Sequence, residues 1–202
     1  MFDRSHAPLE RRGLGLQPHP WRFPAIASRP YSSRRLAYAA LLVAVGLTGA
    51  YAESIPNFES LSLVALCSGV LLGLRDGVIV SSLTMLLYTL LNPYGPAPPL
   101  VMIAQVVGMA LAGASGAWFA SLGGPAWPAA RRAAVLAAIA IVVTAAFDLV
   151  TNLATGLVFG KIRFWLIAGI PFSLWHIGFN VALFAALGTP LTAVLARYSA
   201  RL

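Results

Sequence analysis

Six apolar stretches that carry almost no charge constrain the fold of this chain more than any other feature. They cover, approximately, residues 36–52, 60–74, 77–92, 99–122, 133–159 and 165–196. An apolar helix needs roughly 20 residues to cross the hydrocarbon of a bilayer, and somewhat fewer where neighbouring helices shelter it. The bilayer interior has no water to pair with backbone N–H and C=O groups, so these stretches favour helices. We therefore predict an all-α membrane protein with six transmembrane helices.

The composition supports a membrane protein and excludes two kinds of site. Hydrophobic residues make up 59% of the chain and charged residues 10%, with a mean hydropathy of +0.80, far from the usage of soluble proteins. The one cysteine, Cys67, excludes a disulfide framework and a multi-cysteine metal site. We expect neither a metal nor another cofactor.

The basic residues indicate topology rather than nucleic-acid binding. Seven of the fourteen precede the first apolar stretch, instead of following one face among exposed aromatic rings. With the N-terminus inside, the cytoplasmic segments hold twelve Lys and Arg residues and the outer segments only Lys161 and Arg163. Because cytoplasmic loops are enriched in Lys and Arg, we predict that both termini are cytoplasmic. Residues 1–35 are expected to form a mostly disordered basic tail, and residues 36–202 the membrane-embedded domain.

Two proline-bearing loops on the predicted outer face carry chemistry that a simple membrane turn does not need. Residues 55–59 and 92–99 contain amide, carboxylate and aromatic side chains. A stiff rim with a few hydrogen-bonding groups suits a small-molecule site. The residues assigned to this rim are Asn57, Glu59, Asn92 and Tyr94.

Polar residues within three of the apolar stretches are candidates for a cavity beneath the rim. Asp148 and Asn152 lie four residues apart on one helical face, and Gln105 lies in the fourth stretch. An ionisable group in a membrane costs several kcal/mol unless it is paired or faces a cavity. Two interpretations stay open for these residues: hydrogen bonds that tie helices together, or the lining of a ligand cavity.

The last stretch repeats this pattern with His176 and Asn180, which are again four residues apart, and with Trp165 nearer the outer end. A single histidine among apolar residues is often a core residue. Its pairing with an amide makes a ligand contact an equal alternative. No second histidine or thiolate lies at a suitable spacing, so metal binding is not expected.

Together these features resemble the substrate-binding S component of an energy-coupling factor (ECF) vitamin transporter. The resemblance covers residues 36–196 and rests on the order of residues 55–59, Asn92–Gly95 with the following prolines, the Gly- and Ala-rich stretch 105–116, and residues 171–180. It implies six helices and a binding subunit rather than an enzyme. Such a subunit captures a vitamin or related solute at the outer face of the bacterial inner membrane. Cobalamin, riboflavin and thiamine precursors all stay open as ligands.

The resemblance also implies protein partners. Ala37, Ala40 and Ala44 form a ridge of small residues, of the kind that lets helices approach closely. In the family, an Ala-x-x-x-Ala motif on the first helix docks onto a transmembrane coupling subunit, and here it matches Ala40 and Ala44. The sequence contains no P-loop motif, so two ATPase subunits would supply the energy.

Two alternatives belong to other functional classes. Ser115 in Gly113-Ala-Ser-Gly116, together with His176, is similar to the dyad of rhomboid-type intramembrane serine proteases. Against this, the second stretch offers no His or Asn to stabilise an oxyanion. The other alternative is a structural membrane protein, which the polar residues of the last two stretches disfavour.

Overall fold

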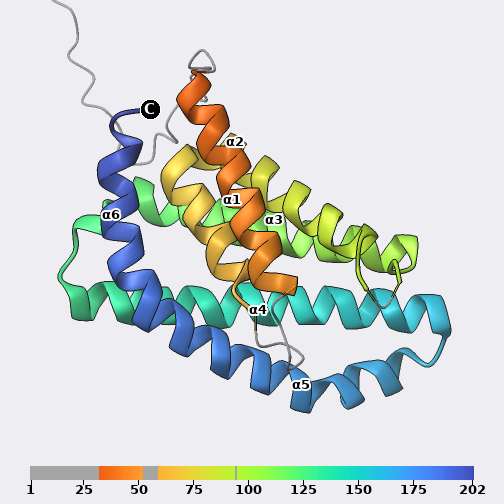
Figure 1. Ribbon diagram of the computed structural model, residues 1–202. Coiled ribbons are helices and arrows are strands. Elements are labelled where there is room, and N and C mark those ends of the chain that lie inside the picture. Colours follow the sequence, from red (N-terminus) through yellow and green to blue (C-terminus); the bar gives the residue numbers. More distant parts are fainter. Residues whose placement is uncertain (1–31, 52–58, 94) are drawn as a thin grey trace, which may run out of the picture.

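The computed structural model describes residues 32–51, 59–93 and 95–202, and all regular structure within them is helical (Figure 1). Residues 1–31, Asn57 and Tyr94 lie outside this part of the chain. The elements in order are α1 Ser33–Tyr51, α2 Leu61–Leu90, α3 Pro99–Ser121, the 3-10 turn η1 Gly124–Ala126, α4 Ala129–Phe159, α5 Ile162–Leu183, the π-helical turn η2 Phe184–Gly188 and α6 Thr189–Ser199.

By length and composition alone, four helical segments could cross a bilayer, although α2 reverses direction within its length. They are α2, α3, α4 and the continuous run Ile162–Ser199, which joins α5 to α6 through η2. This confirms the predicted all-helical class and agrees with a multi-pass membrane protein. The count of six spans and the sidedness of the termini stay predictions.

The helix α2 reverses direction at Gly73. This residue has a left-handed backbone, with φ of 80°, which glycine adopts without the steric cost that a side chain brings. Beyond it the chain folds back, so that the backbone of Gly77 lies against that of Gly69. The half before the turn, Leu61–Leu72, is about 18 Å long at 1.5 Å per residue, which is short of a full crossing.

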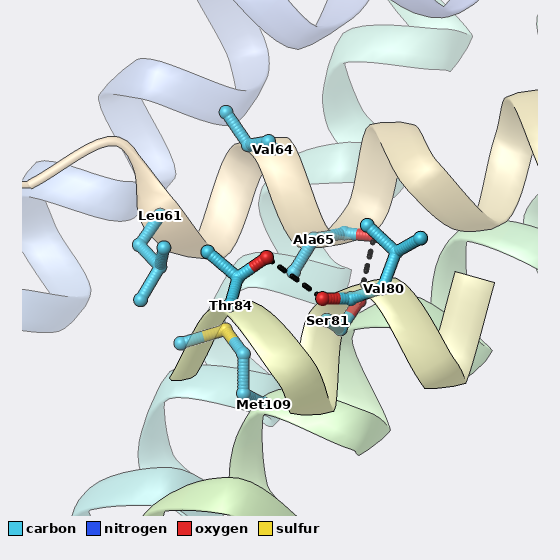
Figure 2. Close-up of a pocket in the computed structure, with 7 residues that line it drawn as sticks. All are labelled: Leu61, Val64, Ala65, Val80, Ser81, Thr84 and Met109. Atoms are coloured by element: carbon cyan, nitrogen blue, oxygen red, sulfur yellow. Dashed lines mark hydrogen bonds between the residues drawn. The ribbon is translucent and has the colours of Figure 1, made fainter. Parts of the chain in front are cut away.

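Small residues bring α3 into close contact with this hairpin. A Cβ atom at Gly116 would overlap the carbonyl oxygen of Leu66, and one at Gly69 would overlap that of Gly113. The crevice between the two halves of α2 and α3, drawn in Figure 2, holds ≈ 0 Å³ of space for a water molecule. The glycines of stretch 105–116 therefore serve close helix packing.

One end of the helix bundle is tied together by Arg35 near the start of α1. The Arg35 guanidinium pairs with Asp76 and donates to the carbonyl oxygen of Leu72, next to the Gly73 turn. The rings of Tyr38 and Tyr198 lie 6.4 Å apart, which brings the start of α1 to the end of α6. Residues 33–35, which we assigned to the tail, form the first turn of α1.

At the other end, a tight turn reverses the chain between α4 and α5. Gly160 and Lys161 both have left-handed backbones, with φ of 71° and 61°. The two helices then run back along each other, below α3 in the view of Figure 1. Phe147 of α4 packs against Gly108 of α3. This arrangement places the polar faces of α3, α4 and α5 toward one another.

Candidate ligand-binding site

A cavity of about 300 Å³ lies between α3, α4 and α5. Its volume is at the lower end of the range for small-molecule sites, roughly 300–1,000 Å³. Four of the residues that the sequence singled out line it together. They are Gln105, Asp148, Asn152 and Trp165.

The lining follows helical periodicity on both long helices. On α4 it consists of residues 147–148 and 151–152. On α5 it consists of Trp165, residues 168–169 and residues 172–173, and the same stripe continues to His176 and Asn180. Steps of three and four residues keep side chains on one helical face. The two faces meet across the cavity.

Two residues that line this cavity each carry a buried polar atom without a partner in the described part of the chain. These atoms are Oδ2 of Asp148 and Oγ1 of Thr151. An unpaired buried polar group costs about 1–3 kcal/mol, and more when it is charged. A site that keeps two such atoms beside an open volume is suited to binding a polar group.

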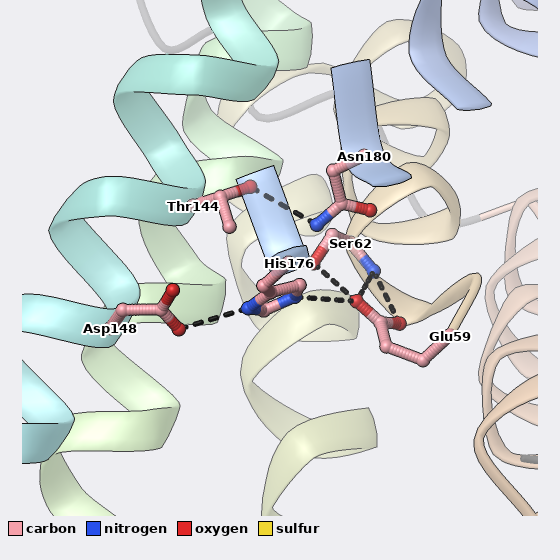
Figure 3. Close-up of polar contacts among 6 residues, drawn as sticks. All are labelled: Glu59, Ser62, Thr144, Asp148, His176 and Asn180. Atoms are coloured by element: carbon pink, nitrogen blue, oxygen red, sulfur yellow. Dashed lines mark hydrogen bonds and ion pairs between the residues drawn. The ribbon is translucent and has the colours of Figure 1, made fainter. Parts of the chain in front are cut away.

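Asp148 also begins a chain of ionisable side chains that runs into the bundle (Figure 3). Its Oδ1 lies 2.9 Å from Nδ1 of His176, and Nε2 of the same ring lies 3.5 Å from Oε1 of Glu59. The side chains are largely removed from solvent, with 12% exposure for each carboxylate and 5% for the imidazole. His176 thus links the cavity wall to the start of α2.

The chain places one imidazole between two carboxylates. A protonated imidazole can donate from both ring nitrogens, whereas a neutral one has a single N–H. An imidazolium at this position can donate toward both carboxylates. With both carboxylates ionised, this cluster of Glu59, Asp148 and His176 still carries one net negative charge.

Glu59 is held where the chain enters α2. Its carboxylate accepts hydrogen bonds from the backbone N–H of Ser62 at 3.1 Å and from the Ser62 hydroxyl at 2.8 Å. A carboxylate is stabilised at a helix N-terminus by the unpaired N–H groups and the helix dipole. We expected Glu59 in the rim and His176 in the cavity, but the structure brings the two into direct contact.

The remaining predicted amide residues differ in position: Gln105 belongs to the cavity wall, whereas Asn92 and Asn180 do not line the cavity. The Asn180 amide donates to Oγ1 of Thr144 at 3.0 Å, one turn below His176. Gln105, which is in the wall, accepts a hydrogen bond from Thr89 at 2.9 Å. Asn92 forms a turn in which its carbonyl accepts from the N–H of Gly95, and it does not line the cavity.

The residues predicted for partner docking are accessible. Ala37, Ala40 and Ala44 are all exposed on α1. Ser115 donates its hydroxyl hydrogen to the carbonyl of Ala112 at 2.7 Å. Within the described residues, the polar groups that contact the His176 ring are the two carboxylates, so Ser115 and His176 form no dyad.

Sequence reasoning missed part of the wall. These residues are Phe147, Thr151, Ala168, Gly169, Phe172 and Ser173. The missed α5 residues could have been found from helical periodicity, because they precede His176 at intervals of three and four residues and share its face of the helix. Nothing local indicated that Glu59 reaches His176, since the contact joins distant segments.

Comparison with known proteins gives no match: no family model, curated protein or solved structure is similar to this chain. Among the described residues, no three His, Cys, Asp or Glu side chains are grouped so that they could hold a metal ion.

Proposed function

We propose that this protein binds a small polar solute in the cavity between α3, α4 and α5. The observation that carries the proposal is the open volume lined by Asp148 and Thr151, whose buried Oδ2 and Oγ1 atoms have no partner among the described residues. In a membrane protein, such polar groups are costly unless a ligand or partner uses them.

The wall chemistry supports a compact heterocyclic ligand. Aromatic side chains stack on planar rings, and here Phe147, Trp165 and Phe172 share the wall with the amides of Gln105 and Asn152. A cavity of about 300 Å³ favours a small vitamin or precursor over a corrinoid such as cobalamin.

In finer terms, the protein acts as the substrate-binding S component of an ECF-type importer in the bacterial inner membrane. It is a binding subunit and not an enzyme. A transmembrane coupling subunit and two ATPase subunits are its partners. The exposed alanine ridge of α1 supports this proposal, because small exposed residues leave room for another helix.

Ligand binding by the purified full-length protein tests the core of the proposal. The protein in lipid nanodiscs is titrated with a panel of water-soluble vitamins and precursors by calorimetry. At least one compound is expected to bind, and its affinity is expected to fall when Ser173→Trp fills the cavity. A folded protein that binds no member of the panel would contradict the receptor function.

Partner docking is tested separately by enlarging the ridge. The double variant Ala40→Leu/Ala44→Leu is expected to bind solute normally but to lose uptake in cells, because the larger side chains prevent close helix contact. Ala138→Leu, the same change at an exposed position on α4, is the matched control and should keep uptake. Unchanged uptake by the double variant would rule out this docking surface.

A further inference from the structure

We propose that the cavity takes a small organic cation, such as an alkylammonium or a cationic heterocycle, with Asp148 as its counter-ion. The inference rests on the proposed solute-binding function and narrows the class of ligand.

The first argument is the charge beside the cavity. Within the described part of the chain, His176 is the one basic group in ion-pair contact with Asp148 or Glu59. One imidazolium between two carboxylates leaves one negative charge away from water. A buried charge without full compensation is strongly unfavourable, so a bound cation would stabilise this arrangement.

The second argument is which oxygen is free. Oδ1 of Asp148 is engaged by His176, whereas Oδ2 is buried and has no partner among the described residues. Thr151, one turn further along α4, lines the same cavity, and its hydroxyl oxygen is likewise buried without a partner there. Both oxygens can accept a hydrogen bond from a protonated amine once their side chains turn toward the cavity.

The third argument is the aromatic wall. Phe147, Trp165 and Phe172 border the same volume as Asp148. The face of an aromatic ring attracts a cation, and the effect grows when water is excluded. A carboxylate combined with aromatic rings is therefore selective for organic cations over hydrated inorganic ones.

The same wall disfavours the opposite charge. No lysine or arginine is among the described residues that line the cavity, and Asp148 would repel an anion. A neutral ligand would leave the excess charge of the cluster uncompensated. The wall thus favours cations over neutral molecules, and neutral molecules over anions.

Binding of a cation should also release a proton. Within the described ranges, the titratable groups that face His176 are Asp148 from α4 and Glu59 ahead of α2, while α3 and α5 contribute only neutral side chains to the cavity wall. A cation on Asp148 competes with the imidazolium for the same carboxylate. The affinity for the cation should therefore rise with pH.

The test adds two sets of shape-matched compounds to the vitamin panel, titrated into the full-length protein in nanodiscs. One set is choline, 3,3-dimethylbutan-1-ol and 3,3-dimethylbutanoate. The other is 1-methylnicotinamide, nicotinamide and nicotinate. We expect the cations to bind at least tenfold more tightly than their neutral counterparts, and the anions to bind most weakly. Titration in two buffers of different ionisation enthalpy should show net proton release.

Three variants test which side chains are responsible for cation binding. Asp148→Asn keeps the shape and removes the charge, and it should lower cation affinity at least tenfold while sparing any neutral ligand. Asp76→Asn, the same change at the carboxylate paired with Arg35, is the control and should bind cations normally. Trp165→Leu should cost several-fold and supplies the test if Asp148→Asn does not fold.

The outcomes separate the two claims. If neutral or anionic compounds bind as tightly as the cations, or if Asp148→Asn binds a cation like the wild type, the cation inference is overturned and the solute-binding function stands. If no compound in the combined panel binds to the folded protein, both are overturned.

Discussion

The two sides of α3 differ in how closely they are packed and in how their polar groups are paired. Toward α2, glycines allow backbones to touch, and the hydroxyls of Ser68 and Ser81 bond to each other at 3.1 Å and to backbone carbonyls. Toward α4 and α5, α3 borders a cavity of about 300 Å³ where Asp148 and Thr151 keep unpartnered oxygens. The α2–α3 contact is dense and its serines are paired, whereas the cavity wall encloses open volume and only some of its polar atoms are paired.

This difference distinguishes polar side chains that stabilise helix packing from polar side chains that are suited to binding a ligand. Interhelical hydrogen bonds between small residues stabilise a bundle when both partners are satisfied. Polar groups left over beside an open volume do not help the fold, so they point to a ligand. Variants on the two sides should accordingly fail in different ways.

The largest effect is expected from crowding the dense side. Gly116→Leu places a side chain where the carbonyl oxygen of Leu66 lies, so α2 and α3 must separate. The cost should exceed the ~1–3 kcal/mol typical of overpacking, because backbone atoms have to move. Thermal unfolding in nanodiscs should show a large fall in Tm or no folded protein. Gly178→Leu, where an added Cβ meets nothing within 4 Å, is the matched control and should unfold near the wild-type Tm.

Removing the central histidine should give the next largest effect. His176→Ala leaves the carboxylates of Glu59 and Asp148 without their shared partner. Breaking a buried ion pair typically costs about 3–5 kcal/mol. Unfolding measurements should show this loss, whereas Leu174→Ala on the exposed face of the same helix should change stability far less. Equal stability of His176→Ala and the wild type would mean that the imidazole does not hold the cluster together.

A smaller effect, on binding rather than folding, is expected from Gly169→Ala. The added Cβ overlaps the amide of Asn152, whose flexible end can move into the cavity. Solute affinity should fall about tenfold, which is ~1.4 kcal/mol, with little change in Tm. Calorimetry checks this against Gly178→Ala on the same helix, which should bind normally. If Gly169→Ala binds as well as the control, Asn152 is not part of the site.

The smallest effect is expected from breaking the ion pair between Arg35 and Asp76. Arg35→Ala removes the ion pair with Asp76 and a donor to the Leu72 carbonyl. Arg35 lies in the first turn of α1 and, at 16% exposure, is the more accessible partner of the pair, so water should take its place; the loss should be about 1 kcal/mol and should grow at low salt. The exposed neighbour Arg34→Ala is the control. A change in solute affinity in Arg35→Ala would show that this ion pair is coupled to the cavity.

The helices were largely predictable, because the length of an apolar stretch and the prolines that bound it are local properties of the sequence. The predicted stretches 99–122, 133–159 and 165–196 correspond to α3, α4 and the run of α5 to α6 within a few residues. The predicted stretches 60–74 and 77–92 leave the break between them at residues 75–76, but the structure reverses the chain at Gly73, where the left-handed backbone lies. Periodicity alone does not say which glycine takes that conformation.

The cavity was predictable in part. Spacing of four residues placed Asp148 with Asn152 and His176 with Asn180, and the structure brings these two faces together. Which helices face each other depends on tertiary packing, such as Phe147 against Gly108, and local sequence does not encode it. The contact of Glu59 with His176 was missed for the same reason.

Native mass spectrometry of the protein purified from its own membrane tests the central claim most directly. The account predicts that the wild type carries a small molecule, and that both Asp148→Asn and the cavity-filled Ser173→Trp lose it while remaining folded. The control Gly178→Ala should keep it. A folded wild type without any such molecule after exposure to the combined panel, or one whose ligand persists in both cavity variants, would contradict the assignment of this cavity as the binding site.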